Sequence, residues 1–291
     1  MRQLKVLDLF SGTQSIAKQF RKRGHFTYTV ELDKEHKGID WYENVMNIEA
    51  KDILERFGQP DVIWISPPCE KFSVASIGKY WTKGSNIPST EESKKALQLL
   101  EHSIKLMKDL NPTYYFIENP RGKMRKMDCM QELPRYTVTY CQYGDTRMKP
   151  TDLWTNHPNP DFKPPCKNGD PCHISAPRGS RTGTQGLKGA KKRSVIPSQL
   201  CEYIATISEQ GFQNIINLEY IVNKLIKMAI NNTSEGNWIF DISEVEKIFE
   251  IKLTNDILKQ IEALFREREE IADIQFYDDN IDIVLYSDYI K

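Results

Sequence analysis

Long apolar runs are missing from this sequence of 291 residues. No stretch approaches the ~20 consecutive apolar residues that a membrane-spanning helix requires, and the first residues, Met1-Arg2-Gln3-Leu4, lack the form of a signal peptide. The six cysteines stand at scattered spacings, which argues against a disulfide framework and suits a reducing cytoplasm. We therefore expect a cytoplasmic protein, large enough for one full α/β domain and a small second one.

Net charge is also absent overall, because 40 Lys and Arg residues balance 40 Asp and Glu residues. The balance hides a division within the chain. Residues 1–210 hold 32 basic and 24 acidic residues, whereas residues 211–291 hold 8 basic and 16 acidic ones. The first part can attract a polyanion such as a nucleic acid, and the second part should repel one.

A complete glycine-rich pyrophosphate fingerprint is missing too, which argues against a dinucleotide and for a smaller adenosine ligand. The apolar run at residues 4–10 ends in the small-residue turn Ser11-Gly12-Thr13, after which a helical pattern begins. A strand, a tight turn and a helix amino terminus form the first unit of a nucleotide-type site. A second strand pattern ends at Glu31, an acid placed to accept hydrogen bonds from ribose hydroxyls.

The next buried-strand pattern, at residues 61–66, is followed by Pro67-Pro68-Cys69. Proline fixes φ and lacks a backbone N–H, so the pair gives the cysteine one defined exit direction. The carboxyl ends of strands are where open α/β sheets bind their ligands. Taken alone, the pattern also fits a buried free cysteine beside a turn. The polar residues 73–93 that follow are typical of a lid, with an ordinary loop as the alternative.

A carboxyl group ends another buried-strand pattern, where residues 113–117 lead into Glu118-Asn119-Pro120. At this position the Glu118 side chain can lie in the same crevice as Cys69. By itself, the pattern would also fit a solvated charge at the end of a strand.

Read in order, these motifs resemble those of the DNA (cytosine-5) methyltransferase family. The match is collinear over roughly residues 1–208. It rests on the segments Asp8-Leu9-Phe10-Ser11-Gly12, Pro67-Pro68-Cys69-Glu70-Lys71-Phe72-Ser73, Glu118-Asn119-Pro120, Gln142-Tyr143-Gly144 and Arg193-Ser194-Val195-Ile196-Pro197. The resemblance implies a Rossmann-like S-adenosylmethionine-dependent methyltransferase α/β sheet with a short target-recognition insert at about residues 157–192. The compact form is similar to stand-alone methyltransferases often carried by bacterial viruses.

The reaction of this family explains why these residue types are needed. Carbon 5 of cytosine is a weak nucleophile until a thiolate adds to carbon 6, so the resemblance makes Cys69 the covalent nucleophile. It assigns Glu118 to ring nitrogen 3 and the exocyclic amine of the cytosine, and Arg147 to the carbonyl oxygen at position 2. The target base must be flipped out of a duplex to reach the thiol.

The resemblance also implies a site for the methyl donor, S-adenosyl-L-methionine. In two places the chain departs from the family pattern: Gln14 stands where another glycine is usual, and Asn44 stands near the position of an acid that contacts the adenine ring. The expected donor-binding residues are Phe10, Ser11, Gly12, Thr13, Glu31, Asn44, Pro67 and Ser194.

DNA is the expected substrate, and positive charge concentrates where the target-recognition insert should be. Between residues 163 and 193 the only acid is Asp170, and glycines such as Gly179, Gly183, Gly186 and Gly189 let the backbone approach phosphates closely. Lysines should set the affinity, while Arg178 or Arg181 could read guanine edges; a solvated basic loop is the alternative. The expected nucleic-acid-binding residues are Ser73, Lys149, Arg178, Arg181, Lys188, Lys191 and Lys192.

The same insert contains Cys166, Cys172 and His173, with His157 nearby. These residues could form a zinc site that staples a segment with little core of its own. A paired Cys-x-x-Cys is missing, however, and adjacent Cys172 and His173 would strain to bind one ion together. The sequence therefore favours reduced cysteines and no metal, with zinc as the weaker alternative.

After residue 211 the family resemblance ends, and a small acidic α+β accessory domain is expected over residues 211–291. Apolar residues at 218–229 and 257–265 follow helical spacing, and residues 274–276 and 281–285 alternate about a turn, as in a hairpin. Helices followed by a β-ribbon are loosely like a winged helix. The excess of acidic residues makes DNA reading improbable and favours contact with a protein partner or self-association.

Two other functions compete with methylation of cytosine in DNA. Methylation of cytosine in RNA, such as tRNA, uses the same chemistry. A catalytically weak DNA-binding or partner-binding protein that retains the fold would explain Gln14 and the lack of a clear pair of arginines around Arg147 and Lys149, where the family has a basic motif. Such a protein would have no need of both Cys69 and Glu118.

Overall fold

A computed structural model describes residues 2–158, 160–175, 189–232, 237–249, 253–277 and 279–286. The chain divides into two compact units, Met1–Glu209 and Gln210–Lys291. No helix among the described residues is long and apolar enough to cross a membrane. The functional division into a methyltransferase domain and an accessory domain stays a prediction.

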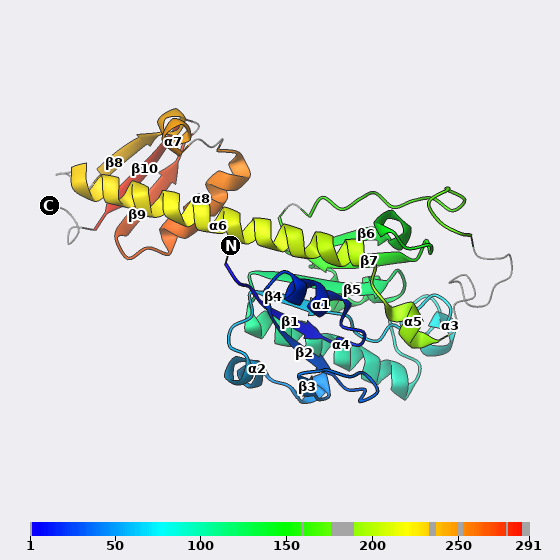
Figure 1. The fold of residues 1–291 in the computed structure, drawn as a ribbon. Helices are drawn as coiled ribbons and strands as arrows, with labels where there is room; N and C mark the ends of the chain where they lie inside the picture. The colour runs from blue at the N-terminus through cyan, green and yellow to red at the C-terminus, as the bar shows by residue number, and fades with distance from the viewer. Residues whose placement is uncertain are drawn as a thin grey trace. The chain divides into compact units, whose positions relative to one another are not determined.

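The first unit is built on a mixed sheet (Figure 1) with strand order β3-β2-β1-β4-β5-β7-β6. Strands β1 to β5 are parallel, whereas β7 runs antiparallel to both β5 and β6. This arrangement confirms the predicted Rossmann-like α/β sheet, with its carboxyl-end crevice. The strands are β1 (Lys5–Leu9), β2 (Phe26–Glu31), β3 (Trp41–Tyr42), β4 (Val62–Ile65), β5 (Tyr114–Pro120), β6 (Arg135–Thr139) and β7 (Pro150–Thr155).

Helices cover both faces of this sheet (Figure 1). Helices α2 and α4 pack on one face over side chains such as Leu7, Ile63 and Ile117, and α1 packs on the other. The long helix α4 begins with a reciprocal capping box between Thr90 and Ser93. The helices are α1 (Ser15–Lys22), α2 (Ala50–Arg56), α3 (Ile77–Tyr80), α4 (Glu91–Leu110), α5 (Ala190–Ser194) and α6 (Ser198–Asn232), and the 3-10 turns are η1 (Val45–Asn47), η2 (Met124–Lys126), η3 (Asp128–Met130) and η4 (Tyr140–Tyr143).

Continuous apolar runs form the central strands because these strands are covered on both faces. All four residues of β4 are buried, and so are the first six of β5. In register, Ile65 pairs with Leu9 on one side and with Ile117 on the other. Strands β1 and β4 therefore end at one level, whereas β5 continues past Ile117 to Pro120 and carries Glu118 beyond that level.

The second unit has its own small core. A three-stranded antiparallel sheet, order β8-β10-β9, packs with helices around apolar residues such as Val222, Ile261 and Ile283. The predicted helical stretches and the predicted hairpin are present, and β8 is an additional strand that the sequence analysis did not predict. The elements are β8 (Asn237–Asp241), α7 (Ile242–Phe249), α8 (Asn255–Arg266), β9 (Ile271–Phe276) and β10 (Asn280–Leu285), together with the last part of α6.

Candidate active site

The turn after β1 is an unusual stretch of backbone. Phe10, Gly12 and Gln14 all have positive φ, at 58°, 44° and 56°, so the chain reverses direction within a few residues before α1 begins. The turn is tied to the end of β2, since the Gly12 N–H donates to the Glu31 carboxylate at 2.9 Å and the Ser11 N–H donates to the Val30 carbonyl at 3.0 Å. The predicted loop and the predicted acid thus lie side by side.

Gln14 takes the left-handed conformation in which glycine is usual. An L-residue in that region costs roughly 1–2 kcal/mol, and here the Gln14 side chain has compensating partners. Its amide donates to the Lys37 carbonyl at 2.8 Å and accepts from Arg21 at 2.9 Å. The departure from the family pattern therefore leaves the backbone path intact.

A cavity of about 400 Å³ opens beside this loop. Gly12 and Thr13, both predicted to bind the donor, are part of its wall, and so is Val195 from the segment before α6. The volume lies within the usual range of small-molecule sites, roughly 300–1,000 Å³. The remaining lining residues are Gln14, Lys18, His36, Lys37, Lys191 and Lys192.

Three other predicted donor residues have structural hydrogen bonds of their own. Asn44 caps η1 by accepting from the Met46 N–H at 3.1 Å. The Ser194 hydroxyl donates to the Lys191 carbonyl at 2.9 Å. The Pro67 carbonyl accepts from the Asn119 side-chain amide at 2.9 Å. Their contact with a donor stays a prediction.

Cys69 follows β4 through the two prolines and is half-buried. Its carbonyl accepts from the Phe72 N–H at 3.0 Å, so the segment turns back at once. Burial raises the pKa of the Cys69 thiol, the negative charge of Glu118 raises it further, and the positive charge of Lys149 lowers it. Cys69 and Glu118, which were predicted to share one crevice, are therefore close enough for the charge of Glu118 to affect the ionisation of the thiol.

Glu118 is held from two directions. It belongs to β5 and is buried, with 6% of its surface exposed, and the Tyr140 hydroxyl donates to its Oε1 atom at 2.9 Å. The next residue, Asn119, donates to the Pro67 carbonyl. Because this hydrogen bond joins the end of β5 to the Pro-Pro turn, it sets the spacing between the carboxylate and the thiol.

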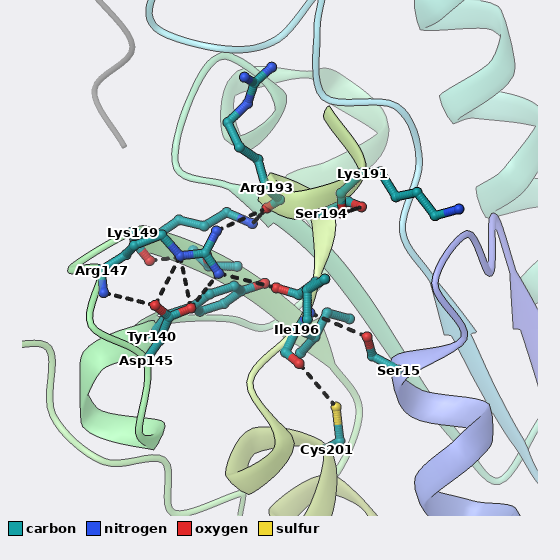
Figure 2. A network of polar contacts seen from close by, with 12 residues as sticks. Ser15, Tyr140, Asp145, Arg147, Lys149, Lys191, Arg193, Ser194, Ile196 and Cys201 are labelled. Carbon is teal, nitrogen blue, oxygen red and sulfur yellow. Dashed lines mark hydrogen bonds and ion pairs between the residues drawn. The ribbon is translucent and has the colours of Figure 1, made fainter. Parts of the chain in front are cut away.

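Arg147 and Lys149 differ sharply in their surroundings (Figure 2). The Arg147 guanidinium forms a close ion pair with Asp145, with Nε donating to both carboxylate oxygens at 2.9 Å. Burial raises the pKa of the Asp145 carboxyl, but the pairing with Arg147 lowers it by more, so the pKa lies below its usual value. Lys149 lies over the Tyr140 ring, 4.4 Å from its centroid, and donates to the Arg193 carbonyl at 3.2 Å. Burial lowers the pKa of Lys149, while Glu118 and Cys69 raise it.

Residues 193–195 connect the two parts of the site. Val195 lines the cavity, and its carbonyl accepts from Arg147 at 3.4 Å. The Arg193 carbonyl accepts from Lys149, the cation beside Cys69 and Glu118. Figure 2 shows the Lys149 side chain reaching the Arg193 carbonyl. The cavity and Lys149, whose charge acts on the thiol, therefore border the same segment.

The segment after Cys69 is more firmly packed than a simple lid would be. Trp81 is buried against Phe72, with ring centroids 5.5 Å apart, and its indole N–H donates to the Lys71 carbonyl at 2.7 Å. Lys123 fixes a later part of the segment by donating to the Ser85 carbonyl at 2.6 Å. Trp81 thus anchors this segment. Closure of the segment over a base stays a prediction.

The predicted nucleic-acid contacts are only partly described. The Ser73 hydroxyl lies 3.1 Å from that of Ser76, and Lys191 and Lys192 line the cavity beside the donor loop. Their contact with DNA stays a prediction. The predicted residues Arg178, Arg181 and Lys188 lie outside the described residues.

The sequence analysis missed one association in the insert. Cys166, Cys172 and His173 lie together as the zinc alternative required, and Cys141 of η4 joins them. Cys141 is 25 residues before Cys166, so no local spacing indicated it. His157 lies elsewhere, with Nε2 at 3.1 Å from the Ile207 carbonyl.

Comparisons with known proteins agree with the motifs. The family model for C-5 cytosine-specific DNA methylase matches residues 4–134. A protein of Frog virus 3 (isolate Goorha), named "Probable DNA (cytosine-5)-methyltransferase", is 35% identical over 158 residues, which cover 53% of this chain and 71% of the viral protein.

Solved structures with a similar fold include the methyltransferase EhMeth of Entamoeba histolytica, with 12% identity and a TM-score of 0.41, and the S. pombe Dnmt2 methyltransferase, with 13% identity and a TM-score of 0.39. The match covers 53% of this chain in both cases, and 53% and 49% of the two solved chains, so this chain spans about half of their length. The similarity to the viral protein, together with the family model, shows that this chain belongs to the C-5 cytosine-specific DNA methylase family, whose methyl donor is S-adenosyl-L-methionine.

Proposed function

We propose that this chain methylates carbon 5 of cytosine in DNA through a covalent bond between Cys69 and carbon 6 of the base. The observation that carries this proposal is the grouping of Cys69, Glu118 and Lys149 at the carboxyl ends of β4 and β5, where each affects the ionisation of another. A thiol, a carboxylate and a cation within reach of one another match the three kinds of contact that a cytosine ring requires.

The Cys69 thiolate adds to carbon 6, which breaks the aromaticity of the ring and makes carbon 5 a nucleophile. When bound, S-adenosyl-L-methionine supplies the methyl group, which leaves its sulfonium for carbon 5. A base then removes the proton from carbon 5, and the thiolate leaves carbon 6. Since the thiolate is the reactive form and burial disfavours it, the charge of Lys149 supports the attacking state of the sulfur.

Glu118 suits the amino edge of the cytosine. A proton shared between the Glu118 carboxyl and ring nitrogen 3 would stabilise the negative charge that develops there as carbon 6 is attacked, and a hydrogen bond donated by the exocyclic amine to the carboxyl would select cytosine over thymine. The hydrogen bond from Tyr140 orients the carboxylate and leaves its second oxygen for the base. Such preorganisation avoids the cost of reorienting the group during the reaction.

For the carbonyl oxygen at position 2 we favour Lys149 over Arg147. The Arg147 guanidinium is engaged by Asp145 and by the carbonyls of Arg193 and Val195. The Lys149 ammonium has the Arg193 carbonyl as a hydrogen-bond acceptor and lies within electrostatic reach of both Cys69 and Glu118. Arg147 instead holds the loop that carries Lys149.

The donor is assigned to the cavity beside Gly12 and Thr13. Its volume suits an adenosine-sized ligand. The Glu31 carboxylate at the end of β2, which accepts from the N–H groups of Gly12, Leu32 and Asp33, is the candidate acceptor for a ribose hydroxyl. Val195 would close the pocket from the opposite side.

The buried position of Glu118 supports base flipping as the route of access, because a base stacked in a duplex cannot reach it. The acidic second unit is assigned to contact with a protein partner or a second copy, since its charge disfavours DNA. The compact form of the chain is what supports a role in restriction–modification within the cytoplasm of a bacterial or phage-infected cell.

The direct test measures transfer of a labelled methyl group to duplex DNA and to tRNA. We expect transfer to DNA, no transfer after Cys69→Ala, and donor affinity nearly unchanged in that variant; Cys129→Ala, a half-buried cysteine elsewhere, serves as the control. Preferential methylation of tRNA would reassign the substrate, and turnover by the Cys69→Ala variant would remove the covalent mechanism.

A further inference from the structure

Four side chains outside the reaction site converge on one point of the first unit. The Sγ atoms of Cys141, Cys166 and Cys172 and a ring nitrogen of His173 all lie within 4.8 Å of one another. Three of these residues are buried, and Cys172 is half-buried.

Three of the separations match the edges of a tetrahedron around a zinc ion. With Zn–S near 2.3 Å and Zn–N near 2.0–2.1 Å, ideal geometry requires about 3.8 Å between two sulfurs and about 3.6 Å between sulfur and nitrogen. The His173 Nδ1 atom lies 3.7 Å from the Cys166 sulfur and 3.6 Å from the Cys172 sulfur. The sulfurs of Cys141 and Cys172 are 3.6 Å apart, while those of Cys141 and Cys166 are closer, at 3.0 Å.

The backbone around the cluster holds the ligands in place. The Cys166 N–H donates to the Thr139 hydroxyl at 3.0 Å, two residues before Cys141. The N–H of Lys167 donates to the Asp170 carboxylate at 2.6 Å, which closes the turn that brings Cys172 back to Cys166. The Ile174 N–H then donates to the Thr146 carbonyl at 2.9 Å. Adjacent Cys172 and His173 can therefore both face the same point.

We propose that Cys141, Cys166, Cys172 and His173 bind one structural zinc ion. Three thiols lose their protons on binding and the imidazole binds as the neutral form, so the complex of Zn²⁺ with three thiolates carries a net charge of −1. Four protein ligands leave no open position, which is the mark of a structural rather than a catalytic site.

The position of the ion gives it a role in the architecture of the first unit. Between β7 and α5, the described residues form no helix or strand, so this part of the chain has little regular structure to fix it. The ion would staple it to η4, where Cys141 is the neighbour of Tyr140, the hydrogen-bond donor to Glu118. The same loop continues to Arg147 and Lys149.

The test is the metal content of the full-length protein purified without chelators. We expect one zinc per chain by elemental analysis, and tetrahedral thiolate absorption bands after exchange with Co²⁺. Cys141→Ser, Cys166→Ser and Cys172→Ser should each lose most of the zinc, whereas the matched control Cys129→Ser should keep it. His173→Gln should lose zinc, and His173→Cys, which restores a fourth ligand, should retain it even if the serine variants fold poorly.

Folded wild-type protein without stoichiometric zinc would overturn the proposal. So would a disulfide between Cys141 and Cys166 found by peptide mapping under non-reducing conditions, or equal zinc in His173→Gln and wild type. Zinc content does not depend on methyl transfer, so this result is independent of the proposed function.

Discussion

At the scale of single residues, the reactivity of Cys69 depends on two charges of opposite sign. Burial and Glu118 raise the pKa of the thiol, while Lys149 lowers it. A thiol with a raised pKa holds less thiolate at neutral pH than a free cysteine, whose pKa is about 8.5. Methyl transfer therefore requires that the sulfur lose its proton when the substrate binds, with the positive charge of Lys149 stabilising the thiolate.

The rate of Cys69 alkylation by iodoacetamide should consequently rise with pH, with a midpoint above that of a free cysteine. Lys149→Met should raise the pKa further and slow alkylation at pH 8, whereas Glu118→Gln should lower it and speed alkylation. Mass spectrometry of the Cys69 peptide measures the rate. The exposed Lys105→Met variant should leave it unchanged, and a midpoint below pH 8 in the wild type would contradict this view of the site.

At the scale of elements, the site lies where β1 and β4 end and where β5 runs on to Pro120 and carries Glu118. The hydrogen bond from Asn119 to Pro67 joins the end of β5 to the turn after β4, and the Gly12 N–H joins the turn after β1 to Glu31. Strand β1 also carries a buried acid, Asp8, which accepts from the Ala17 N–H at 3.3 Å. Burial raises the pKa of Asp8 to about 7.

Asp8→Asn should therefore stabilise the first unit at high pH. A carboxyl whose pKa is raised in the folded state destabilises the fold as pH rises from about 4 to 7, and the penalty is constant above that. At pH 8 the variant should gain up to roughly 4 kcal/mol in free energy of unfolding, and the gain should shrink towards pH 5. Urea unfolding followed by tryptophan fluorescence measures this, since four of the five tryptophans lie in the first unit.

The exposed Asp109→Asn variant, which loses only a surface pair with Lys105, should show no such pH dependence. A lower stability of Asp8→Asn at both pH values would mean that the carboxylate is needed in its charged form.

The strands and the reactive residues at their ends could be predicted from the sequence because local patterns mark them. Buried apolar runs predicted β1, β4 and β5, the acid Glu31 marked the end of β2, and the motifs at the ends of β4 and β5 singled out Cys69 and Glu118. What could not be predicted depends on loops that bring distant residues together. Cys141 and Cys166 are brought together by the folding of the chain between them. The ion pair of Arg147 with Asp145 depends on the conformation of their loop. Strand β8 is short and carries no strong alternating pattern.

At the scale of the whole molecule, charge is divided between the two units. The first part of the chain holds the excess of basic residues and the second the excess of acidic ones. The cores are separate as well, since the residues of the second core come from α6 onward. A separate role can therefore be proposed for each unit.

Deleting residues 211–291 should leave methyl transfer within a few-fold of the full chain, because the residues assigned to the reaction all precede the deletion. Affinity for DNA should rise at low salt, since the acidic unit no longer repels the phosphates, and the difference should fade as salt screens the charges. Filter binding across a salt series measures this, with circular dichroism as the check on folding. Loss of turnover in a folded truncated protein would show that the second unit completes the site.

The central claim is that Cys69 bonds to carbon 6 of an extruded cytosine, and duplex DNA containing 5-fluorocytosine tests it most directly. Fluorine at carbon 5 cannot be removed as a proton is, so the thiolate cannot leave and the adduct persists. With S-adenosyl-L-methionine present, the wild type should form a denaturation-resistant complex with this DNA that maps to Cys69, and Cys69→Ser should form none. A folded, donor-binding wild type that forms no adduct, or one at another residue, would contradict the account.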